Sequence, residues 1–138
     1  MRYTKWISAL MLLFLPIIAA AQMKPGERVV TQVPFKFMVG TVEMPAGEYT
    51  VQLTDQKAGI LTVANRDEKL STYALTVPNL GPKSQNAALV FHRYGDRYFL
   101  AELKAEDSRT RYSFRLTKLE KELRAQNGSA TDILLASK

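Results

Sequence analysis

Apolar and polar residues alternate along most of the chain from residue 33 onward. The alternation is clearest in residues 33–39, 49–53, 70–77 and 111–116. A period of two predicts strands that bury one face. Val42 and Met44 predict a short strand, and the short, largely apolar run at residues 60–64 predicts another. Pro34 cannot donate to a strand ladder, so we expect the first strand to lie at a sheet edge or to pair only after Pro34.

The clearest turn signal lies in the second half of the chain. Residues 87–94 and 97–104 are two aromatic-rich runs on either side of Gly95-Asp96. A two-residue connection that contains glycine predicts a β-hairpin, because glycine readily takes a positive φ. Earlier in the chain, residues 78–82 (PNLGP) predict the end of a strand and the start of the longest loop, which ends near Gln85.

The period changes after Leu116. Thr117 and Glu120 match a capping box, in which the threonine hydroxyl accepts from the Glu120 amide and the carboxylate reaches back. We therefore expect a short helix over residues 117–126, ended by Asn127-Gly128. Residues 127–138 are either a loose tail or a terminal strand, and the sequence does not decide between them.

These elements predict a single, mainly β domain. Turn signals between short strands at about 8–12 residue spacing indicate a small antiparallel sandwich or barrel of about six to eight strands, with one short carboxy-terminal helix. We expect residues 22–29 to be a leader and residues 30–126 to form the domain, with its helix at residues 117–126.

The amino terminus predicts where the protein goes. A positively charged start precedes an apolar run at residues 7–18, and Ala19-Ala20-Ala21 supplies small residues for a signal peptidase. This order predicts a cleaved secretory signal, residues 1–21. A membrane anchor is the alternative, but the run contains Pro16 and is shorter than the ~20 residues of a spanning helix. We expect a periplasmic or extracellular protein without a membrane span after cleavage.

The composition of the chain excludes several classes of functional site. The 138-residue chain has no cysteine and a formal net charge of +6. Without cysteine there is no thiol nucleophile, thiolate metal site or lipid on cysteine, and packing must replace disulfides. Acidic residues interrupt the basic ones throughout, so we expect no nucleic-acid partner. The oligomeric state stays open.

Few residues suit catalysis. His92 is the only histidine, and no carboxylates lie at helical metal-ligand spacing from it. No Gly-x-Ser-x-Gly motif is present to expose a serine nucleophile. The acidic groups Asp67-Glu68, Glu106-Asp107 and Glu120/Glu122 are predicted to be solvated, in turns or on a helix surface. We therefore predict a protein that is not an enzyme, with no metal or other cofactor and a structural role for His92.

Arginine and tyrosine are concentrated in the predicted hairpin and in the strand that follows it. The candidate binding residues are Arg93, Tyr94, Arg97, Tyr98, Arg111 and Tyr112. If that last strand pairs with the hairpin, the six lie close together, and aromatic faces flanked by guanidinium groups suit sugars, acidic polymers or a protein partner. The alternative interpretation is structural: the rings cover the sheet edge, and the arginine stems pack while their charged heads stay in water.

Three segments carry a family resemblance: VPFKF at residues 33–37, MPAGEYTV at residues 44–51 and LVFHRYGDRYFL at residues 89–100. Over about residues 30–124 the chain resembles a family of small secreted bacterial proteins, of the Acidobacteria type, for which no activity is established. Met44 stands where leucine is common in that family. The resemblance implies export and a compact β domain, and it transfers no catalytic residue.

Three functions are consistent with these observations. The first is an exported, non-catalytic binding or structural protein of the cell envelope or medium, whose partner is an unknown envelope component, a polysaccharide or a protein. The second is a carrier that holds a small apolar ligand inside a barrel. Its lining would be Phe35, Phe37, Tyr49, Val51, Leu89 and Phe91. The third, a hydrolase that uses His92, is the least favoured.

Overall fold

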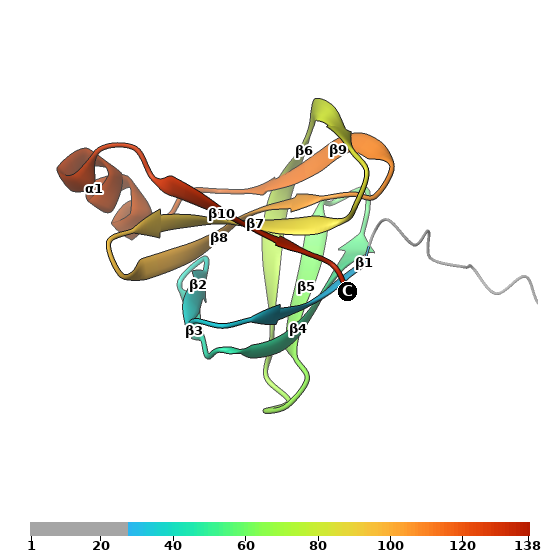
Figure 1. Cartoon of the computed structure of the whole chain (residues 1–138), viewed down its shortest axis with the longest axis horizontal. Helices are drawn as coiled ribbons and strands as arrows, with labels where there is room; N and C mark the ends of the chain where they lie inside the picture. Colours follow the sequence, from blue (N-terminus) through green and yellow to red (C-terminus); the bar gives the residue numbers. More distant parts are fainter. Residues whose placement is uncertain (1–27) are drawn as a thin grey trace, which may run out of the picture.

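The computed structural model describes residues 28–138, so the predicted signal and most of the predicted leader lie outside the described residues. The described chain is mainly β with one short helix, as predicted. In chain order the elements are β1 (Arg28–Val33), β2 (Phe37–Val39), β3 (Val42–Met44), β4 (Gly47–Asp55), β5 (Ile60–Asn65), β6 (Ser71–Ser84), β7 (Ala88–Tyr94), β8 (Arg97–Lys104), β9 (Ser108–Phe114), α1 (Lys118–Asn127) and β10 (Thr131–Ala136) (Figure 1). No helix of residues 28–138 is long and apolar enough to span a membrane.

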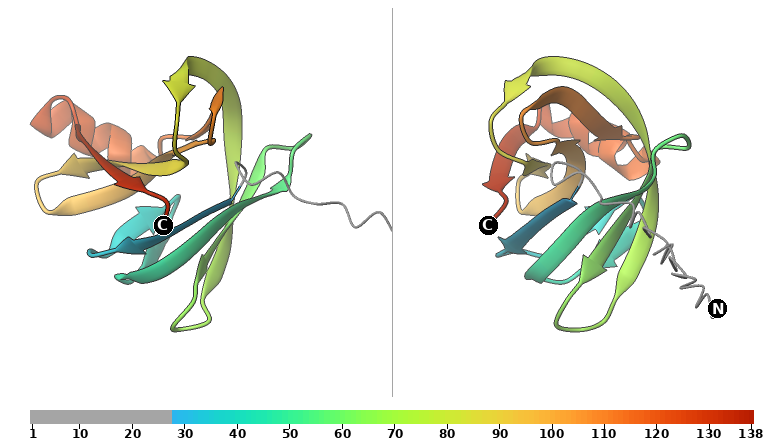
Figure 2. Two further views of the ribbon diagram at one scale, coloured as in Figure 1. Left: turned by 45° about the vertical axis from the view of Figure 1, so that its right-hand side comes forward. Right: turned by 90° about the vertical axis from the view of Figure 1, so that its right-hand side faces the viewer.

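Two groups of strands share the long strand β6. Strands β1, β4, β5 and the first half of β6 form one antiparallel group. The second half of β6 pairs with β9, which is followed by β8, β7 and β10. The β2–β3 hairpin joins β8 through a parallel contact between Met38 and Phe99. The two groups curve around a common interior, which fits the sandwich or barrel class broadly (Figure 2).

Strand β6 corrects the prediction of a long loop at residues 78–85. The strand runs from Ser71 to Ser84, with an irregularity in its pairing between Leu80 and Ser84. Beyond Thr76 it pairs only with β9, where Pro78 faces Tyr112. The Thr76 N–H donates to Gly59 O on the β5 side, so by alternation the Pro78 nitrogen also points to that side, beyond the start of β5. The missing N–H of Pro78 therefore costs no ladder hydrogen bond.

The predicted strand at residues 33–39 is two strands in different parts of the molecule. β1 ends at Val33 and pairs with β4, whereas β2 starts at Phe37 and pairs with β3 and β8. Pro34 lies in the break between them. The alternation of residues 33–39 nevertheless marks the buried side, because Val33, Phe37 and Val39 are buried. β1 also begins at Arg28, inside the stretch predicted as a leader.

Aromatic rings fill the interior between the strands. The Phe37 ring centroid lies 4.9 Å from that of Tyr49 and 5.1 Å from that of Phe91, both close to perpendicular. Phe35 adds a further edge-to-face contact with Phe91 at 5.2 Å. Such contacts stabilise a core beyond the burial of area alone. Val51 and Leu89, the other predicted interior residues, are fully buried in the same cluster.

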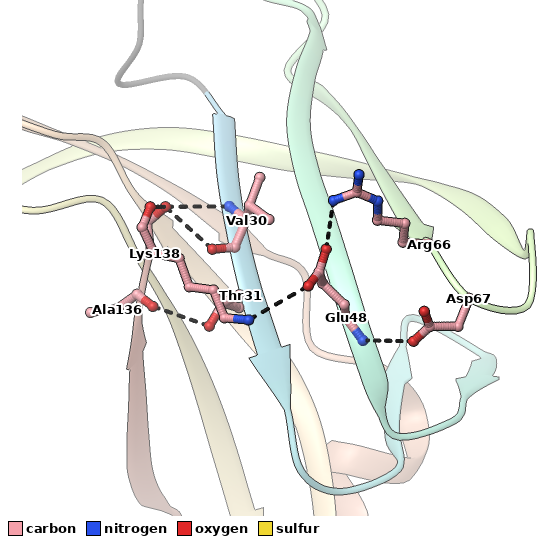
Figure 3. Close-up of polar contacts among 8 residues, drawn as sticks. Val30, Thr31, Glu48, Arg66, Asp67, Ala136 and Lys138 are labelled. Atoms are coloured by element: carbon pink, nitrogen blue, oxygen red, sulfur yellow. Dashed lines mark hydrogen bonds and ion pairs between the residues drawn. The ribbon is translucent and has the colours of Figure 1, made fainter.

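Residues 127–138, which the sequence left open, include a terminal strand. β10 pairs with β7 from Thr131 to Ala136. Its end then meets β1, because the Lys138 N–H donates to Val30 O at 2.9 Å. The Thr31 hydroxyl donates to Ala136 O at 3.0 Å (Figure 3). Lys138 Nζ also lies 3.5 Å from Glu48 Oε2 on β4. These contacts join the last strand to the first.

The helix begins as the sequence predicts. The Thr117 hydroxyl accepts from the Glu120 N–H at 3.2 Å, which caps α1 at its amino end. Only this half of the predicted capping box is seen, since the Glu120 carboxylate contacts β7 and not the backbone of Thr117. The helix therefore lies against the outer face of β7.

Candidate functional site

The β7–β8 hairpin projects from one end of the molecule, below α1 (Figure 1). Tyr94 pairs with Arg97 across the two-residue turn, as predicted. Gly95 takes φ +63°, the value that a type II′ turn requires at its first central position. This tight turn places residues 93–98 at the tip and divides their side chains between the two faces of the hairpin.

One face of the tip carries Arg93 and Tyr98, a cross-strand pair. The Tyr98 ring stacks on Phe35 with centroids 3.8 Å apart, and the Arg93 guanidinium carbon lies 5.7 Å from the Tyr98 centroid. Arg93 also donates from Nε to Gly95 O at 2.6 Å. The packed core thus supports the Tyr98 ring, while Arg93 remains exposed beside it.

A shallow groove of about 240 Å³ adjoins this tip. Tyr98, Arg97 and Lys36 line it together with the acids Glu43 and Asp96. Neither Arg97 nor Lys36 makes an ion pair within the described part of the chain. The groove therefore holds two cationic and two acidic groups beside an aromatic ring, and neither cation is engaged in an ion pair.

Tyr94 points to the opposite face and takes part in a buried polar network under α1. Its hydroxyl donates to Glu120 Oε1 at 3.2 Å, and the Nδ1–H of His92 donates to the same oxygen at 2.6 Å. Arg124 Nε donates to the Tyr94 hydroxyl at 3.4 Å. Burial raises the pKa of Tyr94, and the bond to Tyr94 raises the pKa of Arg124. The network fastens the helix to the hairpin.

Glu120 corrects a prediction, because the sequence placed it on a solvated helix surface. Its relative exposure is only 4%. The hydrophobic period of α1 gave no sign of this, since the stabilising partners come from a strand distant in sequence. Its place at the third position of a capped helix gives no hint of burial, and its partner His92 lies 28 residues earlier in the chain.

Arg111 and Tyr112 lie apart from the hairpin tip. Arg111 faces Lys104, seven residues along β8 from Arg97, a distance of about 23 Å at the usual strand rise. Its Nη1 pairs with Glu102 at 3.2 Å, and its side chain crosses Gly81, where a Cβ would come within 2.2 Å of Nε. Tyr112 is in the core. The six predicted residues therefore do not form one surface. Arg93, Arg97 and Tyr98 lie at the tip with Tyr94, but Tyr94 is buried beneath α1, and Arg111 and Tyr112 lie elsewhere.

A second groove, of about 290 Å³, lies beside the Glu120 network. His92, Arg111 and Arg124 line it, with Asp132 at its edge. The Nε2 atom of His92 lies 3.8 Å from Asp132 Oδ1, so both ring nitrogens of His92 face carboxylates. Acid–base catalysis needs a ring nitrogen directed at the reacting group, so this arrangement does not favour the hydrolase hypothesis.

No grouping of three or more metal-binding side chains occurs within residues 28–138. No family model, curated protein or solved structure matches this chain. The resemblance to small secreted bacterial proteins therefore stays a prediction from the sequence, and the hairpin tip itself is the basis for a functional proposal.

Proposed function

We propose that this chain is an exported, non-catalytic binding protein whose contact surface is the tip of the β7–β8 hairpin. The tip cluster consists of Lys36, Arg93, Arg97 and Tyr98. The partner that best fits its chemistry is an acidic polysaccharide of the cell envelope or its surroundings. Export is argued from the signal-like segment at residues 1–21.

One observation carries the proposal: the tip joins a rigid aromatic ring to unpaired cations. Tyr98 is held by its stack on Phe35, so little conformational freedom is lost when a sugar ring packs beside it. Arg97 and Lys36 line the adjoining groove together with Glu43 and Asp96, and neither cation forms an ion pair among the described residues. Guanidinium groups suit carboxylate and sulfate groups because they donate in a planar fork.

The filled interior does not favour the carrier alternative. Phe35, Phe37, Tyr49 and Phe91 contact one another in the space that an enclosed ligand would need. A ligand there would have to displace rings from a close-packed core, at a cost of several kcal/mol. Binding at the tip requires no such rearrangement.

The test is retention of the protein on immobilised alginate, a polyuronate, with neutral dextran as the reference. We expect the wild type to bind alginate, and Arg93→Gln/Arg97→Gln to lose most of that binding without unfolding. The matched control is Lys57→Gln/Lys83→Gln, which removes the same charge from two exposed positions away from the tip. If both double variants lost alginate binding equally, net charge alone would explain the binding, and the proposal would be contradicted.

A further inference from the structure

Strand β6 has an open edge along its first five residues. From Ser71 to Leu75 it pairs with β5 on one side. On the other side its pairing with β9 starts only at Thr76. Within the described part of the chain, no strand covers the edge of residues 71–75.

The backbone groups of alternate residues, Ser71, Tyr73 and Leu75, point out of this edge. Asn65 N–H donates to Leu70 O at 2.7 Å, and Thr76 N–H donates to Gly59 O at 2.8 Å. Residues 70 and 76 thus both direct their backbone toward β5, and alternate residues between them do the same. The N–H and C=O groups of Tyr73 and Leu75 therefore point away from β5, toward the open edge.

The helix cap explains why the edge is open. Phe114 faces Thr76 at the end of β9. If β9 continued in the same register, Arg115 would face Leu75 and Thr117 would face Tyr73. Thr117 instead caps α1, so the chain leaves β6 after Phe114. The two pairings with Leu75 and Tyr73 are therefore not formed, and the chain continues into the helix over β7 instead.

A cleft of about 410 Å³ lies along this edge. Residues 72–75 of β6, the turn at residues 39–42 and the linker at residues 114–117 line it. Tyr73 and Leu75 are 69% and 60% exposed there, high values for large apolar side chains. Arg115 is the only charged side chain in the lining.

We propose that this cleft binds an extended segment of another protein, which adds to β6 as a further strand. Outward N–H and C=O groups two residues apart match the repeat of a peptide backbone, and strand addition at a sheet edge uses this match. The apolar lining calls for apolar side chains at alternate positions, and Arg115 calls for an acidic residue near one end. The edge accommodates about five residues at the usual strand rise.

The probe is an array of seven-residue peptides with Val, Ile, Phe or Tyr alternating with Thr or Ser, and Asp at one end. We expect a subset to bind and to slow hydrogen exchange at the amides of Tyr73 and Leu75. N-methylation of the bound peptide at alternate residues removes its donors and should abolish binding in one of the two registers only. Absence of binding across the array would overturn the proposal, as would equal binding in both methylation registers.

Two substitutions at one position separate the backbone from the side chain. Leu75→Pro removes an outward N–H and leaves the β5 ladder intact, whereas Leu75→Ala keeps the N–H. Loss of one hydrogen bond predicts binding about three- to tenfold weaker in Leu75→Pro than in Leu75→Ala. Val77→Ala is the matched control, since Val77 lies on the same face but faces Ser113 of β9. Equal affinities in the two Leu75 variants would contradict strand addition.

The competing possibility is that a second copy of this chain pairs with the β6 edge. Light scattering on the wild type tests it by measuring the oligomeric state. We expect a monomer without peptide. A dimer that Leu75→Pro dissociates would show that the edge pairs with itself and would overturn the proposal. The hairpin variant Arg93→Gln/Arg97→Gln should keep full peptide affinity. Failure of this proposal can therefore be distinguished from failure of the proposed function.

Discussion

The backbone N–H of Lys138 donates to the carbonyl of Val30 at 2.9 Å, which joins the last described residue to the first strand. Ser137 and Thr31 add hydrogen bonds on either side, with Val30 N–H to Ser137 Oγ at 3.3 Å. The joint draws β10 against β1 and so connects the two groups of strands at a second place besides their shared strand β6.

This joint should contribute measurably to stability. Thr31→Val removes the donor to Ala136 O at a buried position, and we expect a loss of about 1 kcal/mol in the free energy of unfolding. Amide exchange at Lys138 should also become faster. Thr50→Val, on the solvent side of the neighbouring strand, is the control. A Thr31→Val variant that matches Thr50→Val in both measurements would show that the joint is not stabilising.

The Glu120 network should account for most of the attachment of α1. Glu120→Ala leaves the donors of His92 and Tyr94 without their acceptor at a buried site, so we expect a loss of about 2 kcal/mol in urea unfolding. Glu122→Ala, exposed on the same helix, should change stability by less than about 0.5 kcal/mol. If the two variants behaved alike, the helix would have to be held by other contacts.

The raised pKa of Tyr94 predicts that the free energy of unfolding decreases at high pH. Burial raises its pKa above the ordinary value of 10.0, so the folded protein retains the phenol proton more strongly than the unfolded chain. This difference in pKa contributes fully to the free energy of unfolding below pH 10. The contribution is lost as the pH rises through the raised pKa of the folded protein. Burial raises the pKa of Tyr49 too, so some decline remains in any single variant.

Stability measured from pH 8 to pH 11 tests this expectation. Tyr94→Phe should be less stable than the wild type at pH 8, since the bond to Glu120 is lost, but should decline less steeply above pH 10. Tyr73→Phe, at an exposed position, serves as the reference. A slope in Tyr94→Phe as steep as in the wild type would contradict a raised pKa of Tyr94 in the folded protein.

Periodicity predicts the strands and their facing well, because alternate burial is a local property of the sequence. The turn at Gly95-Asp96 and the cap at Thr117 follow from local chemistry in the same way. Pairing is not local. β6 can continue through Pro78 because β5 starts only at Ile60, opposite Leu75, and the break at Pro34 depends on which strands pair with each half.

The candidate site shows the same limit. Strand alternation separates Tyr94 from Arg93, yet only the position of α1 shows that the Tyr94 side is covered. Arg111 and Tyr112 pair with the far end of β8, a register that residue types alone do not determine. Glu120 is buried by partners on a distant strand, so its surroundings could not be predicted from its own helix.

The most direct test of binding at the hairpin tip is an NMR titration of the isotope-labelled domain with alginate oligosaccharides. We predict that the amides of Arg93, Arg97 and Tyr98 shift progressively, while those of α1 and β5 stay in place. Shifts centred on another surface, or none at concentrations where the wild type is retained on alginate, would contradict the assignment of binding to the hairpin tip.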